Sequence, residues 1–90
     1  MSQYSRLGQL LFEARKRSGL TQQQVADRLQ LKSGQSISDI ERREDIRIPI
    51  KTLRRLIELY QLEAGPTFDL YLENEKIRLE KKLLKQFQKG

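Results

Sequence analysis

The absence of two residue types excludes several classes of function. The 90-residue chain contains no cysteine and no histidine, so it lacks thiolate and imidazole metal ligands, disulfides, and Cys–His or Ser–His nucleophile pairs. A site made of carboxylates or lysines would still need a pocket, for which so short a chain leaves little volume. We therefore expect no enzymatic activity, no metal and no cofactor. The lack of cysteine suits a reducing compartment.

Long apolar runs are also missing. The N-terminus, Met-Ser-Gln-Tyr-Ser-Arg, is polar, and no segment approaches the roughly 20 apolar residues that a bilayer span requires. We expect neither a signal peptide nor a transmembrane helix, and hence a soluble, cytoplasmic protein.

Positive charge is in excess and unevenly placed. Lys and Arg number 18 against 12 Asp and Glu, a net charge of +6. Residues 1–62 carry 12 basic and 7 acidic groups, whereas residues 63–90 carry 6 and 5. Basic surfaces bind polyanions such as nucleic acid. The alternative is that the excess only keeps the chain soluble.

Apolar residues at helical spacing predict four helices before residue 63. The first spans residues 5–19, and the second opens with a capping box, Thr21-x-x-Gln24. Ser33 is placed to cap a short third helix, and Pro49 suits the first turn of a fourth. Residues 42–48 read as a charged loop. The predicted apolar faces are Leu7, Leu10, Leu11 and Ala14; Val25, Ala26 and Leu29; Ile37 and Ile40; and Leu53, Leu56, Ile57 and Tyr60.

The pattern changes after Gly65-Pro66. Phe68, Leu70 and Leu72 alternate with polar positions, which predicts a strand with one apolar face. A lone strand needs a partner, and the simplest is a second copy paired antiparallel across a two-fold axis. Residues 74–88 predict a short amphipathic helix, either docked or frayed. The residues expected at this dimer or partner interface are Phe68, Leu70, Tyr71 and Leu72.

The predicted order of helix, capped helix, tight turn, short polar helix, basic loop and closing helix is a helix-turn-helix arrangement. Three segments, LGQLLFEARKRSGLTQQQVADRLQL, SGQSISDIERR and KTLRRLIELYQL, resemble the Xre family of Cro/CI-type regulators. The resemblance implies a mainly α, lambda-repressor-like bundle of four to five helices over residues 1–63. Residues 64–90 would then form a C-terminal strand and helix for dimerisation or partner binding.

The chain departs from the family pattern at the turns. Gln30 stands where the family usually has glycine, and Lys32 lengthens the turn before the third helix. Arg43 replaces the customary glycine after Glu-Arg, and one residue is inserted between Glu41 and Thr52.

The resemblance implies residue roles on double-stranded DNA. The third helix would read bases in the major groove, with Gln35 making a bidentate contact to adenine. Asp39 would accept from cytosine, or repel wrong sequences or hold an arginine. The Arg15–Glu41 pair would link the first and third helices internally. The base-reading set is Gly34, Gln35, Ser38 and Asp39. The phosphate set is Thr21, Gln22, Lys32, Ser33, Ser36, Arg42, Arg43, Arg47 and Lys51. The alternative for Gln22 is that it is an ordinary exposed side chain. The alternative for each cation is that it contacts nothing.

The overall layout, a helix-turn-helix domain followed by a strand, resembles the HipB-type antitoxins. Members of that family pair strands across a dimer, bind a HipA-type kinase toxin and repress their own operon. The resemblance therefore implies a homodimeric repressor on a palindromic operator, with a kinase toxin as partner. The alternatives are a stand-alone phage- or plasmid-type repressor and a protein-binding module that has lost DNA binding.

Overall fold

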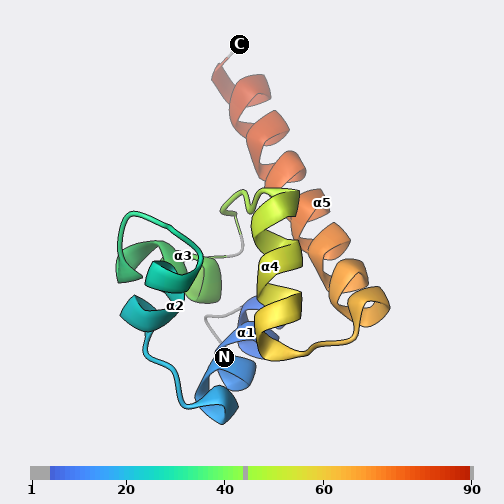
Figure 1. The fold of residues 1–90 in the computed structure, drawn as a ribbon. Coiled ribbons are helices and arrows are strands. Elements are labelled where there is room, and N and C mark those ends of the chain that lie inside the picture. The colour runs from blue at the N-terminus through green and yellow to red at the C-terminus, as the bar shows by residue number, and fades with distance from the viewer. Residues whose placement is uncertain (1–4, 44, 90) are drawn as a thin grey trace.

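The computed structural model describes residues 5–43 and 45–89, and within these ranges it contains helices but no strand. The helices are α1 (Arg6–Ser18), α2 (Gln22–Arg28), α3 (Gly34–Arg42), α4 (Ile50–Tyr60) and α5 (Ala64–Lys89). Figure 1 shows a body formed by α1 to α4, with α5 running along one side and projecting beyond it. The mainly α class is confirmed. Glu44, part of the predicted charged loop, lies outside the described residues.

The predicted starts of the first three helices are confirmed by their caps, whereas Pro49 directly precedes α4 and makes no side-chain cap. The Ser5 hydroxyl accepts a hydrogen bond from the first turn of α1. At α2 the Thr21 hydroxyl accepts from the Gln24 N–H at 3.1 Å, while the Gln24 side chain accepts from the Thr21 N–H at 2.9 Å. At α3 the Ser33 hydroxyl accepts from the Gln35 N–H at 3.2 Å, without a reciprocal side-chain bond. Gly19 ends α1 with φ +72°, a left-handed conformation that favours glycine.

One apolar core lies between the helices. α3 packs on α2 and α1, and α5 packs on α1 and α4. Ile48 and Tyr71 are buried there although neither belongs to a predicted apolar face. The buried core residues are Leu7, Leu11, Ala14, Val25, Ala26, Leu29, Ile37, Ile40, Ile48, Leu53, Leu56, Tyr60 and Tyr71.

The predicted strand is wrong, because residues 68–72 lie within α5. The helix buries Thr67, Tyr71 and Asn74, which follow one another at spacings of four and three residues. Of the four expected interface residues, Tyr71 is therefore buried in its own chain and Leu70 packs half-buried against the core. Phe68 and Leu72 are exposed. A strand pair across a dimer is excluded for this structure.

Specific hydrogen bonds fasten the first half of α5 to the body. The Tyr71 hydroxyl donates to the Ile48 carbonyl oxygen at 2.8 Å, and Asn74 donates to the Ser5 hydroxyl at 3.1 Å. Burial, and then the Glu75 carboxylate, raise the pKa of Tyr71, so its hydroxyl remains a donor. These bonds fix α5 against both the start of α1 and the loop before α4.

The second half of α5 extends past the body. A 26-residue helix is about 39 Å long, and the molecule measures 45 Å along its longest axis against 29 and 27 Å across. From Leu79 to Lys89 every residue is exposed. Among the described helices, none combines the length and apolar character of a membrane span.

Candidate nucleic-acid interface

One side of α3 carries polar side chains that are not buried. The opposite side, which is buried, packs against α1 and α2. Gln35 and Arg42 are exposed, and Ser38 and Asp39 are half-buried. The outer face of α3 is defined by Gln35, Ser38, Asp39 and Arg42. The structure thus brings together three of the four predicted base-reading residues.

Asp39 orients the Gln35 side chain. The Gln35 amide nitrogen Nε2 donates to Asp39 Oδ1 at 3.0 Å, a contact between neighbouring turns of the helix. A side-chain amide has two N–H groups, so one N–H and the carbonyl oxygen remain for a ligand. Those are the donor and acceptor that a bidentate contact with adenine uses. Asp39 therefore holds a neighbouring glutamine, a role that the sequence did not predict.

Gly34 lies where α3 starts against α2. A Cβ atom at this position would be 3.2 Å from the Gln23 backbone nitrogen, closer than ordinary contact. The Gly34 N–H donates to the Gln23 side chain at 3.2 Å. This close approach gives the glycine a packing role, and its predicted proximity to a base stays a prediction.

The turn between α2 and α3 contains a left-handed residue. Gln30 has φ +58°, a conformation that costs a side-chain-bearing residue about 1–2 kcal/mol relative to the right-handed one. This is the position at which the resembling family usually has glycine. The Leu31 N–H then donates to the Ala26 carbonyl oxygen at 2.8 Å, which closes the turn.

A buried ion pair joins α1 to α3 behind the outer face. Arg15 Nε donates to Glu41 Oε2 at 2.7 Å, and Arg15 Nη1 donates to the Leu20 carbonyl oxygen at 2.9 Å. Gln22 Nε2 donates to the second carboxylate oxygen, Oε1, at 3.2 Å. The predicted internal role of Arg15 and Glu41 is confirmed. Gln22 is an additional partner, so it is not an ordinary free surface side chain.

A shallow hollow opens above this ion pair. It gathers the predicted phosphate contacts Thr21, Gln22 and Arg42 from α2 and α3, together with Lys16 of α1. Lys16 is a cation that the sequence analysis did not select. The full lining is Phe12, Arg15, Lys16, Gly19, Leu20, Thr21, Gln22 and Arg42.

The other predicted phosphate contacts differ in their surroundings. Lys32, Arg47 and Lys51 are exposed. Arg43 is also exposed but pairs with Asp45 at 3.3 Å. The remaining two, Ser33 and Ser36, lie half-buried at the start of α3, with the Ser33 hydroxyl used as the cap.

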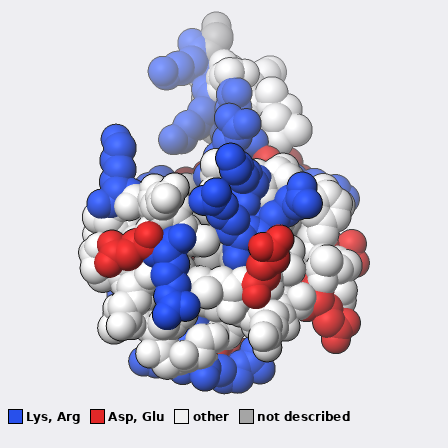
Figure 2. Space-filling model, in the orientation of Figure 1, with Lys and Arg blue, Asp and Glu red and all other residues white. Residues whose placement is uncertain are grey.

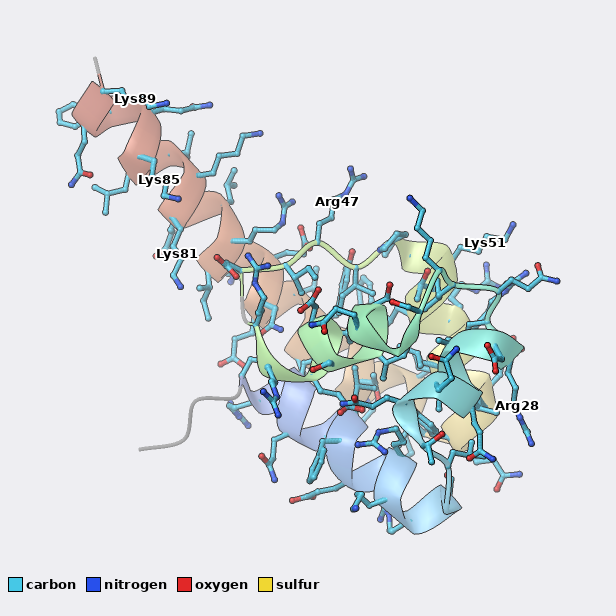
Figure 3. The ribbon with its side chains drawn as sticks, turned by 90° about the vertical axis from the view of Figure 1, so that its left-hand side faces the viewer. Arg28, Arg47, Lys51, Lys81, Lys85 and Lys89 are labelled. Atoms are coloured by element: carbon cyan, nitrogen blue, oxygen red, sulfur yellow. The ribbon has the colours of Figure 1, made fainter. Side chains whose placement is uncertain are left out.

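A basic groove between the loop before α4 and the projecting part of α5 was missed from the sequence. Figure 3 shows Lys81, Lys85 and Lys89 following one another along α5, with Arg47 on the loop. On the face drawn in Figure 2, basic side chains gather over this projecting helix and the adjoining body. The residues that line the groove are Asp45, Arg47, Arg78, Lys81, Lys82, Leu84, Lys85 and Gln88.

The acidic residue of the basic groove stays ionised. Slight burial opposes the charge on Asp45, but the hydrogen bond and charge of Arg43, with Lys81 further away, hold the pKa of this carboxyl below its ordinary value. The groove keeps a positive excess because this one carboxylate faces five cations, Arg47, Arg78, Lys81, Lys82 and Lys85. Its signal in the sequence is the helical spacing of Arg78, Lys81 and Lys85, which becomes readable only when the tail is treated as one helix.

Metal ligands do not cluster in the described part of the chain: no group of three or more acidic residues there is arranged to hold an ion.

Comparison with known proteins agrees with this geometry. Residues 6–69 match the family described as a helix-turn-helix domain. The chain belongs to this helix-turn-helix family. No curated protein and no solved structure gave a match. Membership in this family supports DNA as a partner of the chain. The match extends into the first two turns of α5, so this helix-turn-helix domain includes the start of that helix.

Proposed function

We propose that this helix-turn-helix protein is a sequence-specific transcriptional repressor that binds a palindromic operator as a homodimer in the cytoplasm. The observation that carries the proposal is the outer face of α3, where Asp39 holds the Gln35 amide with a free donor and acceptor. The third helix of this arrangement lies in the major groove, where such an amide discriminates adenine from the other bases.

Cations surround this face at positions suited to phosphates. Lys16 and Arg42 lie in the hollow beside the start of α2, and Arg47 and Lys51 follow α3 in the chain. The basic groove along α5 adds further cations beyond the helix-turn-helix unit itself. Phosphate contacts supply most of the affinity, while base contacts supply the specificity.

A stand-alone repressor is favoured over an antitoxin. The resemblance to HipB-type antitoxins depended on a C-terminal strand, and residues 64–89 are helical. We therefore propose no kinase toxin as partner. We also infer that the protein is not an enzyme, because a chain without histidine and cysteine lacks the commonest catalytic groups.

Selection from a random pool of duplex DNA tests the proposal. We expect enrichment of a palindrome whose half-sites lie about 34 Å apart, one helical turn of DNA. Fluorescence anisotropy on the enriched duplex should then show affinity that falls steeply with salt, with a logarithmic slope of about 0.9 per phosphate contacted. A scrambled duplex of equal length is the control.

Two outcomes contradict the proposal. Negligible binding at low salt would identify a protein-binding module that has kept the fold and lost DNA binding. Equal affinity for the enriched and scrambled duplexes would identify a non-specific DNA-binding protein.

A further inference from the structure

The side of α5 turned away from the body carries an exposed apolar stripe. Phe68, Leu72, Leu79 and Leu83 are 42%, 44%, 50% and 54% exposed. At 3.6 residues per turn these four positions fall within an arc of about 60°. We call them the outer stripe. Solvent exposure of four large apolar side chains on one side of a helix indicates a binding surface.

The outer stripe is accessible along its whole length. The body holds α5 by a different side, through Thr67, Tyr71 and Asn74. Past residue 78 the helix projects beyond the body, as Figure 1 shows. A second helix could therefore lie along the stripe without meeting the body of its own chain.

Charge is segregated along the same helix. Residues 63–75 contain four acidic residues and no Lys or Arg, whereas residues 76–89 contain six Lys or Arg and one acidic residue. The boundary falls between Glu75 and Lys76, which is also the middle of the outer stripe. An antiparallel copy would place each acidic segment beside the basic segment of its partner, whereas a parallel copy would place like charges together.

We propose that two copies of this chain pair through the outer stripes of α5 in antiparallel orientation, with the two-fold axis passing between Glu75 and Lys76. Simple counting along the helices from this axis puts Phe68 level with the partner's Leu83, and Leu72 level with the partner's Leu79. Every apolar residue of the stripe then meets another. The interface supplies the homodimer of the proposed function, but it stands on observations that involve no DNA.

Analytical ultracentrifugation of the full-length protein without DNA tests the pairing. We expect a dimer that the variant Leu72→Ser/Leu79→Ser weakens by at least about a hundredfold in Kd, since each substitution acts twice in a two-fold dimer. Leu84→Ser is the matched control, because Leu84 is 58% exposed but lies off the stripe and lines the basic groove. Circular dichroism checks that the variants keep their helices.

Disulfide trapping tests the orientation, and the absence of native cysteine makes it direct. Oxidation of an equimolar mixture of Leu72→Cys and Leu79→Cys proteins should give the mixed disulfide. Leu83→Cys alone should not cross-link. In the antiparallel pair the two copies of position 83 lie 15 residues apart along the helices, which is about 22 Å.

Three results would overturn the inference. Wild-type protein that is still monomeric at a concentration of about 100 µM, where even a weak dimer would form, would show that the stripe does not pair with itself. Efficient cross-linking of Leu83→Cys would show a parallel pair. A dimer unaffected by Leu72→Ser/Leu79→Ser would place the interface elsewhere. DNA binding measured on the same proteins stays a separate result, so the proposed function can survive any of these.

Discussion

Arg15 and Glu41 lie 26 residues apart in the chain and meet inside the protein, with 2.7 Å between Nε and Oε2. Their side chains are 9% and 2% exposed. Gln22 bonds to the same carboxylate. The pair therefore connects α1 and α3 and also fixes a residue at the start of α2, where DNA phosphate is expected.

Removing one partner of this pair should be strongly destabilising. We expect Arg15→Ala and Glu41→Ala each to cost about 3–5 kcal/mol, because the remaining charge stays buried without its partner. Urea unfolding followed by circular dichroism measures the destabilisation. The double variant Arg15→Met/Glu41→Leu should be destabilised by much less than the sum of the two single variants. Single effects below about 1 kcal/mol would be those of a surface pair and would contradict the buried role.

Replacing Gln35 should change which DNA is bound. Gln35→Ala should weaken operator binding by about 1–3 kcal/mol and relax specificity at one base pair. Asp39→Ala should loosen the same base preference by less, because it frees the amide without removing it. Competition anisotropy against operators substituted one base pair at a time measures both effects. If Gln35→Ala lowered affinity for operator and random DNA equally, another side chain would be the base reader.

Charge in the basic groove should affect all DNA sequences alike. Lys81→Gln/Lys85→Gln should reduce the slope of log affinity against log salt by about 0.9 for each phosphate that the two lysines neutralise. Lys81→Arg/Lys85→Arg keeps the charge and should keep the slope. Both variants leave the apolar residues of the outer stripe intact. The glutamine variant removes two charges of the basic segment 76–89, so its dimerisation is measured separately by analytical ultracentrifugation. A slope unaltered by the glutamine variant would show that DNA does not reach the groove.

Two glycines in helices should respond differently to alanine. A Cβ at Gly8 would collide with the Glu41 backbone oxygen of α3, whereas a Cβ at Gly65 meets nothing within 4 Å. Alanine favours the helix by up to about 1 kcal/mol at either site. We therefore expect Gly8→Ala to be destabilising by about 1–3 kcal/mol through overpacking. Gly65→Ala should cost less, because its Cβ would meet only the ring of the following Pro66. Thermal unfolding of the two variants compares them, and equal Tm values would contradict the close approach of α1 and α3.

Local signals predicted the first four helices well. Caps such as Thr21 with Gln24 depend on residues three positions apart, so the sequence displays them directly. The apolar faces of α1 to α4 were readable for the same reason. Gly8 was not readable as a contact point, because its neighbour is the backbone of Glu41 on another helix.

The tail was misread because a short apolar run fits two periods. Phe68, Leu70 and Leu72 satisfy the two-residue repeat of a strand. The side of the helix that is actually buried contains Thr67 and Asn74 beside Tyr71, so its apolar signal is weak. Pro66 looked like a break, but proline is tolerated in the first turn of a helix, where it stands in α5. The same error hid the basic groove, whose lysines share a side only in a helix.

The outer stripe of α5 and the outer face of α3 have no residue in common. If the proposed pairing and operator contacts hold, substitutions that alter which copies pair can accumulate without altering which operator is read. Two diverged copies of such a gene in one cell could then encode proteins that do not form mixed dimers. One protein would need to exchange the acidic and basic segments on either side of the boundary between Glu75 and Lys76. Mixed dimers would then be disfavoured by repulsion, and each repressor would keep its own target.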